Sequence, residues 1–491
     1  MKTFRRTLTI LGITAALGSF SLPAYAQETD PDGGVIFLEP DAEVEAEPPE
    51  IILDEETVEE PAQTAPRAAE FYNQGVELFN EGDYAAAINQ FDAALSINPA
   101  YAAAYLFRGA AYAQLDDIDA ALVSYTRALE VNPNYAIASL SRGVLYYELD
   151  DYPRALDDLD RAITVDPAFV EAYVYRGIIE AELGNTEVAL EDFDDAVRYG
   201  PDYAPAYLHR GLAFRALGNL EAAIIDFTAA TERQDDYAAA YLNRGETYYQ
   251  LGANRRALDD LNTAVRLEDD NIEAHYNRSF VLTALGRFNG AVDDLNQVIE
   301  IDPTYIDAYL ARGTLYAETG NYPAAISDFG KALQLNPDSA EAYNRRANAR
   351  LLAADERGAI ADYTAAINVN PSYAPAHKGR GDAYAILGDL PSALSDYTTA
   401  VEIDSDYMAA YAARGRARYE SGDASGAYED FSRVIVSDSL NPDVYYYRGI
   451  TLVSLGDIAA ARSDLTKAGD LYLEVGEPDG YRTVIDVLSR L

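Results

Sequence analysis

The sequence has no cysteine in its 491 residues, which excludes disulfides, thiolate metal sites and cysteine nucleophiles. Lysine occurs only at positions 2, 331, 378 and 467, and histidine only at positions 209, 275 and 377. The three histidines lie at least 66 residues apart, so no metal-ligand motif is present and no cofactor is expected. After residue 26, no apolar run approaches the roughly 20 residues that span a bilayer. Packing alone must therefore stabilise the fold.

Basic residues are scarce relative to acidic ones. The chain has 82 Asp and Glu against 37 Lys and Arg, a formal charge of −45. This balance argues against nucleic acid or an anionic membrane surface as a partner, because such binding depends on cationic side chains. An acidic, lysine-poor surface reflects either a saline environment or, as we favour, a soluble protein that resists aggregation through its net charge.

The first 26 residues have the pattern of a secretory signal peptide. A basic start is followed by an apolar run from Leu8 to about Leu22 and by the small-x-small cleavage site Ala24-Tyr25-Ala26. The alternative, a retained membrane anchor, is disfavoured because Gly12, Gly18 and Pro23 interrupt a short run. The sequence therefore predicts secretion to the periplasm or the extracellular space, with no membrane insertion after cleavage.

Residues 27–67 are predicted to form a disordered acidic linker. Positions 27–66 contain fourteen Asp or Glu, six prolines and no Lys or Arg, a composition that repels itself and buries little surface. Two apolar clusters, Val35 to Leu38 and Ile51 to Leu53, interrupt the segment. Three interpretations of these clusters are open: docking motifs for a partner, segments that fold back into the protein's own groove, or parts of a solvated spacer. We favour the spacer.

Beyond the linker the sequence repeats with a period of 34 residues. An Arg-Gly step recurs at positions 108, 142, 176, 210, 244, 312, 380, 414 and 448, with Arg278-Ser279 and Arg346-Ala347 filling the two gaps. Extended back to Gln74-Gly75, this register gives twelve units over residues 68–475 without insertion or deletion. A period this strict predicts a repeat array in which each unit packs on its neighbours.

Several columns of the repeat have a fixed character. The fourth position is aromatic in nine units, with Ser139, His275 and His377 as exceptions. The eighth position is small throughout, the twentieth is alanine in all twelve units, and seven units close with proline. This pattern resembles that of the tetratricopeptide repeat. The resemblance implies an all-α fold, an α-solenoid of twelve 34-residue helix-turn-helix repeats wound into a right-handed superhelix.

In the first unit we expect helices over residues 68–80 and 84–96. A C-terminal capping helix is expected over residues 476–491, because the last apolar face of a solenoid needs a polar cover. Tyr481, Val484, Ile485 and Leu488 should face the twelfth repeat, and Arg482, Asp486 and Arg490 should face outward.

The recurring arginine is interpreted as structural. Ten units carry Asp at the twenty-third position, which suggests that the Arg of the first helix meets the Asp of the second helix of the same repeat. Repeat one supports this pairing because Gln74 and Gln90 replace both charges together. Arg108 is the exception, since its repeat offers only Ser124.

The sequence does not favour an enzyme. His275 and His377 occupy a packing column, and adjacent acids such as Asp157-Asp158 recur with the repeat, whereas a catalytic pair would occur once. No phosphate-binding loop, nucleophile elbow or calcium loop is present.

The resemblance instead implies a binding groove on the concave face of the first helices. Mapped onto this sequence, that groove is lined by an apolar row: Leu106, Ala110, Leu140, Val144, Tyr147, Val174, Ile178, Leu208, Leu212 and Tyr249. An exposed row of this kind indicates a protein or peptide partner, and the alternative is that its members pack between neighbouring helices. Because Glu148, Glu182 and Glu246 rim the same face, we expect an apolar ligand with basic character.

Beyond repeat eight the same positions become polar, with Asn344, Asn348, Lys378, Asp382, Arg416 and Arg418, and a second binding zone is conceivable. The carboxylate clamp of chaperone-binding relatives does not match these residues. The leading hypothesis is a non-enzymatic scaffold in envelope protein assembly. The alternatives are a self-assembling structural envelope protein and a chain whose residues 35–38 occupy its own groove.

Overall fold

The computed structural model describes residues 66–491, and every regular element within that range is an α-helix. The chain divides into two compact units at Arg287 and Phe288. The predicted signal peptide and nearly all of the predicted linker, including the cluster at residues 35–38, lie outside the described residues.

Unit 1 contains thirteen helices among its described residues. They are α1 (Pro66–Asn80), α2 (Tyr84–Ile97), α3 (Ala102–Gln114), α4 (Ile118–Val131), α5 (Ala136–Glu148), α6 (Tyr152–Val165), α7 (Val170–Glu182), α8 (Thr186–Tyr199), α9 (Ala204–Ala216), α10 (Leu220–Arg233), α11 (Ala238–Gln250), α12 (Asn254–Leu267) and α13 (Ile272–Ala284). The first repeat thus begins two residues before the expected helix and ends its second helix one residue later.

Unit 2 contains the remaining twelve helices of the described chain. They are α14 (Phe288–Ile301), α15 (Ile306–Glu318), α16 (Tyr322–Leu335), α17 (Ala340–Leu352), α18 (Glu356–Val369), α19 (Ala374–Ile386), α20 (Leu390–Ile403), α21 (Met408–Glu420), α22 (Ala424–Ser437), α23 (Pro442–Leu455), α24 (Ile458–Glu474) and α25 (Pro478–Ser489).

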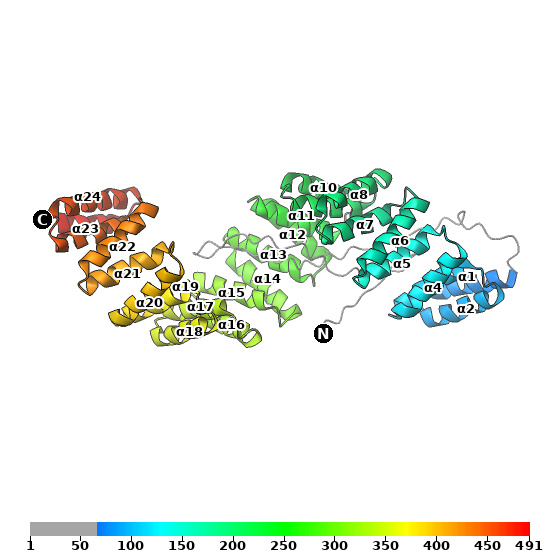
Figure 1. Ribbon diagram of the computed structural model, residues 1–491, viewed down its shortest axis with the longest axis horizontal. Coiled ribbons are helices and arrows are strands. Elements are labelled where there is room, and N and C mark those ends of the chain that lie inside the picture. Colours follow the sequence, from blue (N-terminus) through cyan, green and yellow to red (C-terminus); the bar gives the residue numbers. More distant parts are fainter. Residues whose placement is uncertain (1–65) are drawn as a thin grey trace. The chain divides into compact units, whose positions relative to one another are not determined.

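The helices form a repeating two-layer stack within each unit. We call the odd-numbered helices α1 to α23 the A helices and the even-numbered helices α2 to α24 the B helices. Within a unit, each A helix packs on the B helix of its own repeat, and each B helix packs on the next A helix (Figure 1). The predicted all-α solenoid of helix-turn-helix repeats is confirmed.

A tight turn separates the two helices of each repeat. In the first repeat, Gly82 adopts a φ of 81°, and the side chain of Asp83 then accepts the Ala86 N–H to cap α2. A positive φ favours glycine because it has no Cβ, and the short polar side chain of Asp supplies the acceptor that a helix start needs. Repeats without this glycine use Asp116, Asp150 and Ala354 in the same left-handed conformation.

The invariant small positions lie where the helices approach most closely. All twelve alanines of the twentieth position, from Ala87 to Ala461, have an exposed fraction of 0%. At the eighth position of repeat five, a Cβ built on Gly211 would lie 2.6 Å from a ring carbon of the fully buried Phe227. The two columns therefore set the distance between the A and B layers.

Replacing Gly211 by alanine should destabilise the protein by about 1–3 kcal/mol, because the fully buried Phe227 ring would have to shift to admit the added Cβ. Gly330 is the matched control. It lies within α16, where an added Cβ meets only an arginine nitrogen at 3.7 Å, so alanine there should stabilise by up to about 1 kcal/mol. Urea denaturation measures both effects, and equal responses would refute the close-approach argument.

The predicted pairs between the Arg of an A helix and the Asp of the B helix in the same repeat are present, and we call this series of pairs the arginine–aspartate ladder. In repeat six, the Arg244 guanidinium donates from Nε and Nη2 to both carboxylate oxygens of Asp260, each at 2.8 Å. Equivalent pairs join Arg142–Asp158, Arg176–Asp192, Arg210–Asp226, Arg312–Asp328, Arg346–Asp362, Arg380–Asp396, Arg414–Asp430 and Arg448–Asp464. Each pair links the middle of an A helix to the B helix of the same repeat.

The ladder also reaches the preceding repeat, which the sequence analysis did not foresee. The remaining guanidinium nitrogen of Arg176 donates to Asp160 at 2.5 Å, and that of Arg210 donates to Asp194 at 2.8 Å. The same contact explains Arg108, whose Nη1 reaches Asp92 at 2.6 Å while its Nε donates to Ser124. These arginines therefore connect three helices and couple adjacent repeats.

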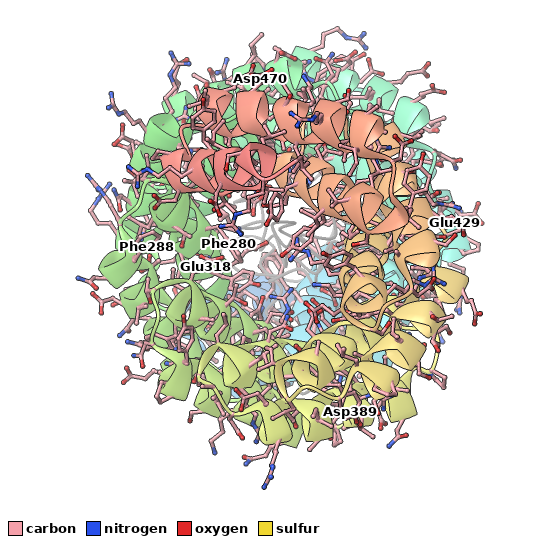
Figure 2. The ribbon with its side chains drawn as sticks, turned by 90° about the vertical axis from the view of Figure 1, so that its left-hand side faces the viewer. Phe280, Phe288, Glu318, Asp389, Glu429 and Asp470 are labelled. Carbon is pink, nitrogen blue, oxygen red and sulfur yellow. The ribbon has the colours of Figure 1, made fainter. Side chains whose placement is uncertain are left out.

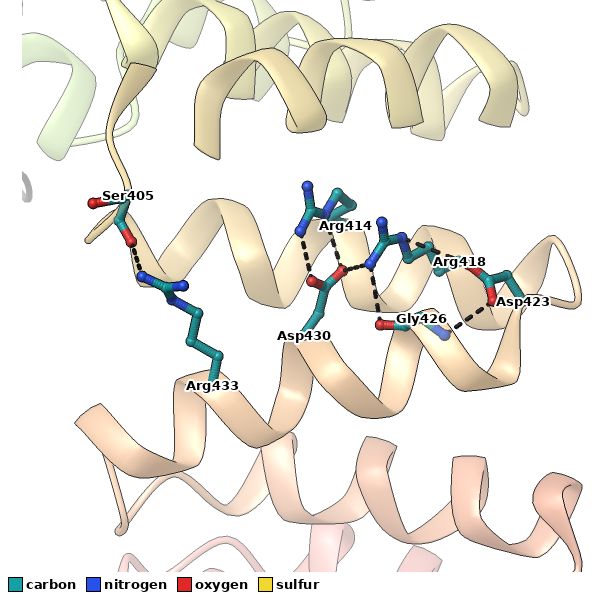
Figure 3. A network of polar contacts seen from close by, with 7 residues as sticks. All are labelled: Ser405, Arg414, Arg418, Asp423, Gly426, Asp430 and Arg433. Atoms are coloured by element: carbon teal, nitrogen blue, oxygen red, sulfur yellow. Dashed lines mark hydrogen bonds and ion pairs between the residues drawn. The ribbon is translucent and has the colours of Figure 1, made fainter. Parts of the chain in front are cut away.

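Repeats nine and eleven hold their buried aspartate with two arginines. In repeat eleven, Asp430 accepts from Arg414 at 2.7 Å and from Arg418 at 2.9 Å (Figure 3). The Arg418 guanidinium also donates to the Gly426 carbonyl at 3.2 Å, so this side chain links α21 to α22. In repeat nine, Arg350 adds a second cation to Asp362 at 3.1 Å.

The C-terminal helix α25 covers the last B helix, α24, as a cap. Val484 is fully buried, and Tyr481, Val487, Leu488 and Leu491 pack around it. The expectation for Ile485 is wrong: its exposed fraction is 44%, and Val487 packs against the cluster instead. Arg482, Asp486 and Arg490 face solvent as expected.

Candidate functional site: the exposed face of the A helices

The fifth, ninth and thirteenth residues of each repeat lie on one side of its A helix, because positions four apart fall on the same helical face. Most successive A helices contact one another directly within a unit, for example α5 with α7 and α17 with α19, and we call the surface that these residues share the A-helix face. In unit 2, Figure 2 shows Glu318, at the thirteenth position of α15, on the inner side of the curved ribbon. Glu429 and Asp470, which lie on B helices, point outward in the same view.

The apolar row predicted in unit 1 is not exposed. Nine of its ten members are buried, with exposed fractions between 0% and 6%: Leu106, Ala110, Leu140, Val144, Tyr147, Val174, Ile178, Leu208 and Leu212. The tenth, Tyr249, is half-buried. The expected exposure is therefore wrong, and that these residues bind a peptide stays a prediction.

Packing between neighbouring A helices explains this burial. Leu140, Val144 and Ile178 belong to one hydrophobic cluster that runs through the first repeats, and α7 contacts both α5 and α9 directly. Tyr147 lies in the same cluster, and its phenol donates to Glu182 at 2.7 Å. In these repeats the predicted row is therefore part of the hydrophobic core, which agrees with the alternative that its members pack between neighbouring helices.

The acids expected to rim this face also have partners within the protein. Glu246 is 6% exposed and accepts from Arg215 at 2.6 Å and from the Asn277 amide, which ties α9, α11 and α13 together. Burial raises the pKa of the Glu182 carboxyl group, which accepts the hydrogen bond from Tyr147. The acidic rim therefore joins helices in this structure, and a basic ligand for it remains a prediction.

The A-helix face of unit 2 is more open and more polar. Asn348 is exposed, and its Oδ1 accepts a hydrogen bond from the Tyr363 phenol at 2.5 Å. Asp382, the equivalent residue of the next repeat, accepts from the Tyr397 phenol at 2.9 Å and from Lys378 at 2.9 Å. Both tyrosines come from B helices, so phenols that reach through from the second layer hold these two polar side chains in place.

Sequence reasoning named Asn348 and Asp382 but missed the two phenols. The signal was present, because the twenty-fourth position is Tyr in repeats nine and ten, where most other repeats have Phe or Leu. A phenol at that position supplies a donor to the polar ninth residue of the same repeat.

Apolar and cationic side chains complete the unit 2 face. Leu352 and Ile386, one helical turn beyond Asn348 and Asp382, are 61% and 60% exposed. Arg416 is exposed, and its guanidinium lies over the Tyr447 ring at 4.7 Å. We call Asn344, Asn348, Lys378, Asp382 and Arg416, together with Leu352 and Ile386, the unit 2 site. Arg418, which the sequence analysis grouped with them, points instead to Asp430.

The histidines have structural roles. At the fourth position, the phenols of Tyr173, Tyr207 and Tyr309 donate to the carbonyl group six residues earlier. His275 and His377 place Nε2 at 3.1 and 3.0 Å from the equivalent carbonyl oxygens, so the imidazole substitutes for the phenol. Within residues 66–491, no group of three or more His, Asp or Glu side chains is arranged to hold a metal ion.

His209 should make stability depend on pH. Complete burial lowers the pKa of its imidazole from 6.5 to about 4, so the unfolded chain binds this proton first as the pH falls. The stabilisation from the neutral side chain is thus complete above pH 6.5 and should be lost progressively between about pH 6.5 and pH 4, by up to about 3 kcal/mol. In melts across this range, His209→Phe should lose less stability than the natural chain, and parallel pH profiles would contradict this assignment.

Tetratricopeptide-repeat profiles match most of the described chain. Profiles described as TPR repeat match residues 75–116, 280–320, 313–352 and 381–422. Profiles described as tetratricopeptide repeat match residues 102–135, 140–204, 176–239, 238–271 and 412–477. The chain therefore belongs to the tetratricopeptide-repeat family. None of these profiles describes an enzyme.

Solved structures of other repeat proteins are similar to parts of the chain. YrrB, described as a TPR protein with an unusual peptide-binding site, is 22% identical over 38% of this chain and 96% of its own, with a TM-score of 0.35. A tetratricopeptide repeat protein from Parabacteroides merdae is 22% identical over 51% of this chain and 98% of its own, with a TM-score of 0.42. Yeast Tom70 is 15% identical over 87% and 97%, with a TM-score of 0.40. No curated protein matches the chain.

None of the helices in residues 66–491 combines the length and the apolar character that crossing a membrane requires.

Proposed function

We propose that this protein is a non-enzymatic scaffold that binds a peptide or a partner protein on the A-helix face of unit 2. The observation that carries the proposal is the exposure of Leu352 and Ile386 beside polar side chains that phenols hold in place. Exposed aliphatic side chains on a rigid surface favour association, because their burial by a partner releases water. Fixed polar neighbours add specificity, since little conformational entropy is lost when they bind.

The non-enzymatic part of the proposal rests on how the reactive side chains are used. Asp158 of the Asp157-Asp158 pair is held by Arg142 through two hydrogen bonds of 2.7 Å, and Asp260 is held by Arg244 in the same way. A carboxylate fixed between helices by a guanidinium is poorly placed for proton transfer to a substrate. His275 and His377 serve as hydrogen-bonding substitutes for tyrosine.

We further propose that the protein acts in the bacterial envelope, in the assembly or retention of other proteins there. The support is the leader pattern of residues 1–26 together with the acidic composition of positions 27–66. Residues 1–65 lie outside the described residues, so the cellular location rests on the sequence. N-terminal sequencing of the protein from envelope fractions tests it, and a chain that begins at Gln27 is the expected result.

A capture experiment with matched variants tests the binding role. The full chain is immobilised and exposed to an envelope extract, beside a chain with Leu352→Arg and Ile386→Arg and a control with Val436→Arg. Val436 lies on the B helix α22 and is 88% exposed, so its change alters charge and exposure without touching the A-helix face. We expect the partner to be retained by the natural chain and the control and lost by the double variant.

Equal retention by all three chains would refute the A-helix face of unit 2 as the binding surface. If no chain retains a partner, sedimentation across a concentration series is the next measurement. A sedimenting mass that increases with protein concentration would favour self-assembly into an envelope structure over the scaffold proposal.

A further inference from the structure

Three arginines stand where an A helix passes into its B helix in repeats six and seven. At positions thirteen to eighteen, ten of the twelve repeats carry at least one Asp or Glu, whereas repeats six and seven carry none. These two repeats have Arg255 and Arg287 there instead, and Arg256 follows Arg255 directly. We call the three residues the arginine patch. Because the other repeats form their turns with acids nearby, the turn itself does not require the arginines.

The arginine patch has no carboxylate partner among the described residues. All three side chains are exposed, and the Arg256 guanidinium lies over the Tyr248 ring at 5.6 Å. Arg255 and Arg256 occupy the first turn of α12, and its N-cap, Ala253, offers no side-chain acceptor. Cations at the start of a helix are disfavoured because the helix dipole is positive there. The stability of α12 therefore does not account for these arginines.

The patch lies at one edge of unit 1 and keeps an excess of positive charge. Because α11 contacts both α12 and α13, the turns that follow α11 and α13 lie at the same edge of the stack (Figure 1). The exposed acids near the starts of the B helices there are Glu221 on α10 and Asp259 on α12. The buried Glu246 and Asp260 are already paired with other arginines. Three arginines against two free acids leave this edge positive in a chain whose formal charge is −45.

We infer that the arginine patch binds residues 39–45 of the same chain, a segment that lies outside the described residues. Every second residue of this segment is acidic: Glu39, Asp41, Glu43 and Glu45. In an extended chain, side chains two positions apart point the same way, so the four carboxylates face the patch together. Guanidinium groups bind carboxylates through charge-assisted hydrogen bonds. No Lys or Arg occurs in positions 27–66 to compete for these acids.

The length of the chain before α1 selects this part of the acidic region. From Pro66, the five steps between successive A helices up to α11 and the length of α1 amount to at most about 70 Å, at about 10 Å a step and about 1.5 Å a residue. Residues 39–45 stand 21 to 27 positions before Pro66, and an extended chain of that length spans about 70–90 Å. The other acidic run, residues 54–60, is at most 12 positions away and spans only about 40 Å. It does not reach the patch.

A segment of the same chain is favoured over a separate anion. Its attachment to α1 gives it a high effective concentration at the patch, whereas the net charge of the molecule repels free polyanions. The inference goes beyond the proposed binding role and uses only unit 1, so it does not depend on the A-helix face of unit 2. It also differs from the alternative in which residues 35–38 occupy the groove, because the contact is electrostatic and lies at the turns.

Energy transfer within the full chain tests the inference. The protein has no cysteine, so Ala42→Cys and the exposed Gln250→Cys provide two unique positions for a donor and an acceptor dye. We expect strong transfer at low salt and a fall of at least about twofold at about 1 M salt, where the Debye length is about 3 Å. Replacing the four acids of residues 39–45 by their amides should lower the transfer equally. The matched control is the set Asp54→Asn, Glu55→Gln, Glu56→Gln and Glu59→Gln, which should leave it unchanged.

Charge reversal of the patch separates this contact from a general charge effect. Arg255→Glu, Arg256→Glu and Arg287→Glu together should abolish the salt-dependent transfer without lowering the melting temperature, because acids are favoured at the start of α12. The control with the same change in net charge reverses three exposed arginines on other parts of B helices: Arg161→Glu, Arg266→Glu and Arg357→Glu.

Three results would overturn the inference. The first is transfer that does not depend on salt, and the second is an equal response to the patch reversal and to its control. The third is loss of transfer when the labelled chain is mixed with an excess of unlabelled chain, which would show that a second copy supplies the acidic segment.

Discussion

Replacing Arg244 by alanine lowers the free energy of unfolding by about 3–5 kcal/mol, the loss expected when a buried ion pair loses one partner. Asp260 is 7% exposed, and the two hydrogen bonds from Arg244 satisfy both of its carboxylate oxygens. Without the guanidinium, a buried carboxylate is left uncompensated. Urea denaturation of the natural chain and the variant measures the loss.

Repeat eleven provides a matched comparison for this prediction. Arg414→Ala should cost less than Arg244→Ala, because Asp430 keeps Arg418 at 2.9 Å. Changing Arg244 to methionine together with Asp260 to leucine should recover most of the lost stability, since apolar replacement of both partners removes the desolvation cost. A denaturation curve unaffected by Arg244→Ala would refute the structural role of the ladder.

The second large effect is expected for Leu140→Asp, which should unfold the first repeats. Leu140 is 2% exposed and belongs to the cluster that joins those repeats, so the new carboxylate would be buried without a partner at a cost of several kcal/mol. Thermal melting followed by far-ultraviolet circular dichroism measures the effect.

This variant also separates the two interpretations of the apolar row in unit 1. If Leu140 lined an open groove, Leu140→Asp would leave the helical signal and the melting temperature unchanged and would impair only partner binding. The structure predicts instead that Leu140→Asp lowers the melting temperature and the helical signal, and that any loss of partner binding follows from this unfolding. An exposed change such as Ile225→Asp, on α10 at 68% exposure, is the control and should alter neither signal.

The sequence was sufficient to predict the fold because the constraints repeat. Twelve alanines at one position and small residues at another leave one way to stack the helices, and the observed burial of Ala87 to Ala461 agrees with that prediction. The one error in the cap, at Ile485, arose because α25 lies outside the 34-residue register, so no repeated column indicated which of its sides faces α24.

The candidate site was harder to predict because side-chain position does not determine exposure. Val144 and Asn348 both occupy the ninth position of their repeats, yet one is buried in the core and the other is exposed. Val144 packs in the cluster that runs through the first repeats, whereas Asn348 accepts a hydrogen bond from the Tyr363 phenol, and a single sequence does not reveal which of these surroundings a ninth residue meets. Likewise, the partner of Arg108 in the preceding repeat depends on the offset between successive helix pairs.

The most direct test of the central claim is hydrogen–deuterium exchange of the full chain with and without its captured partner. Backbone amides exchange more slowly where binding suppresses local opening, so the method reports which helices the partner covers. The account predicts added protection in α17, α19 and α21, with α18, α20 and α22 unchanged. Protection confined to those B helices, or to unit 1, would contradict the assignment of binding to the A-helix face of unit 2.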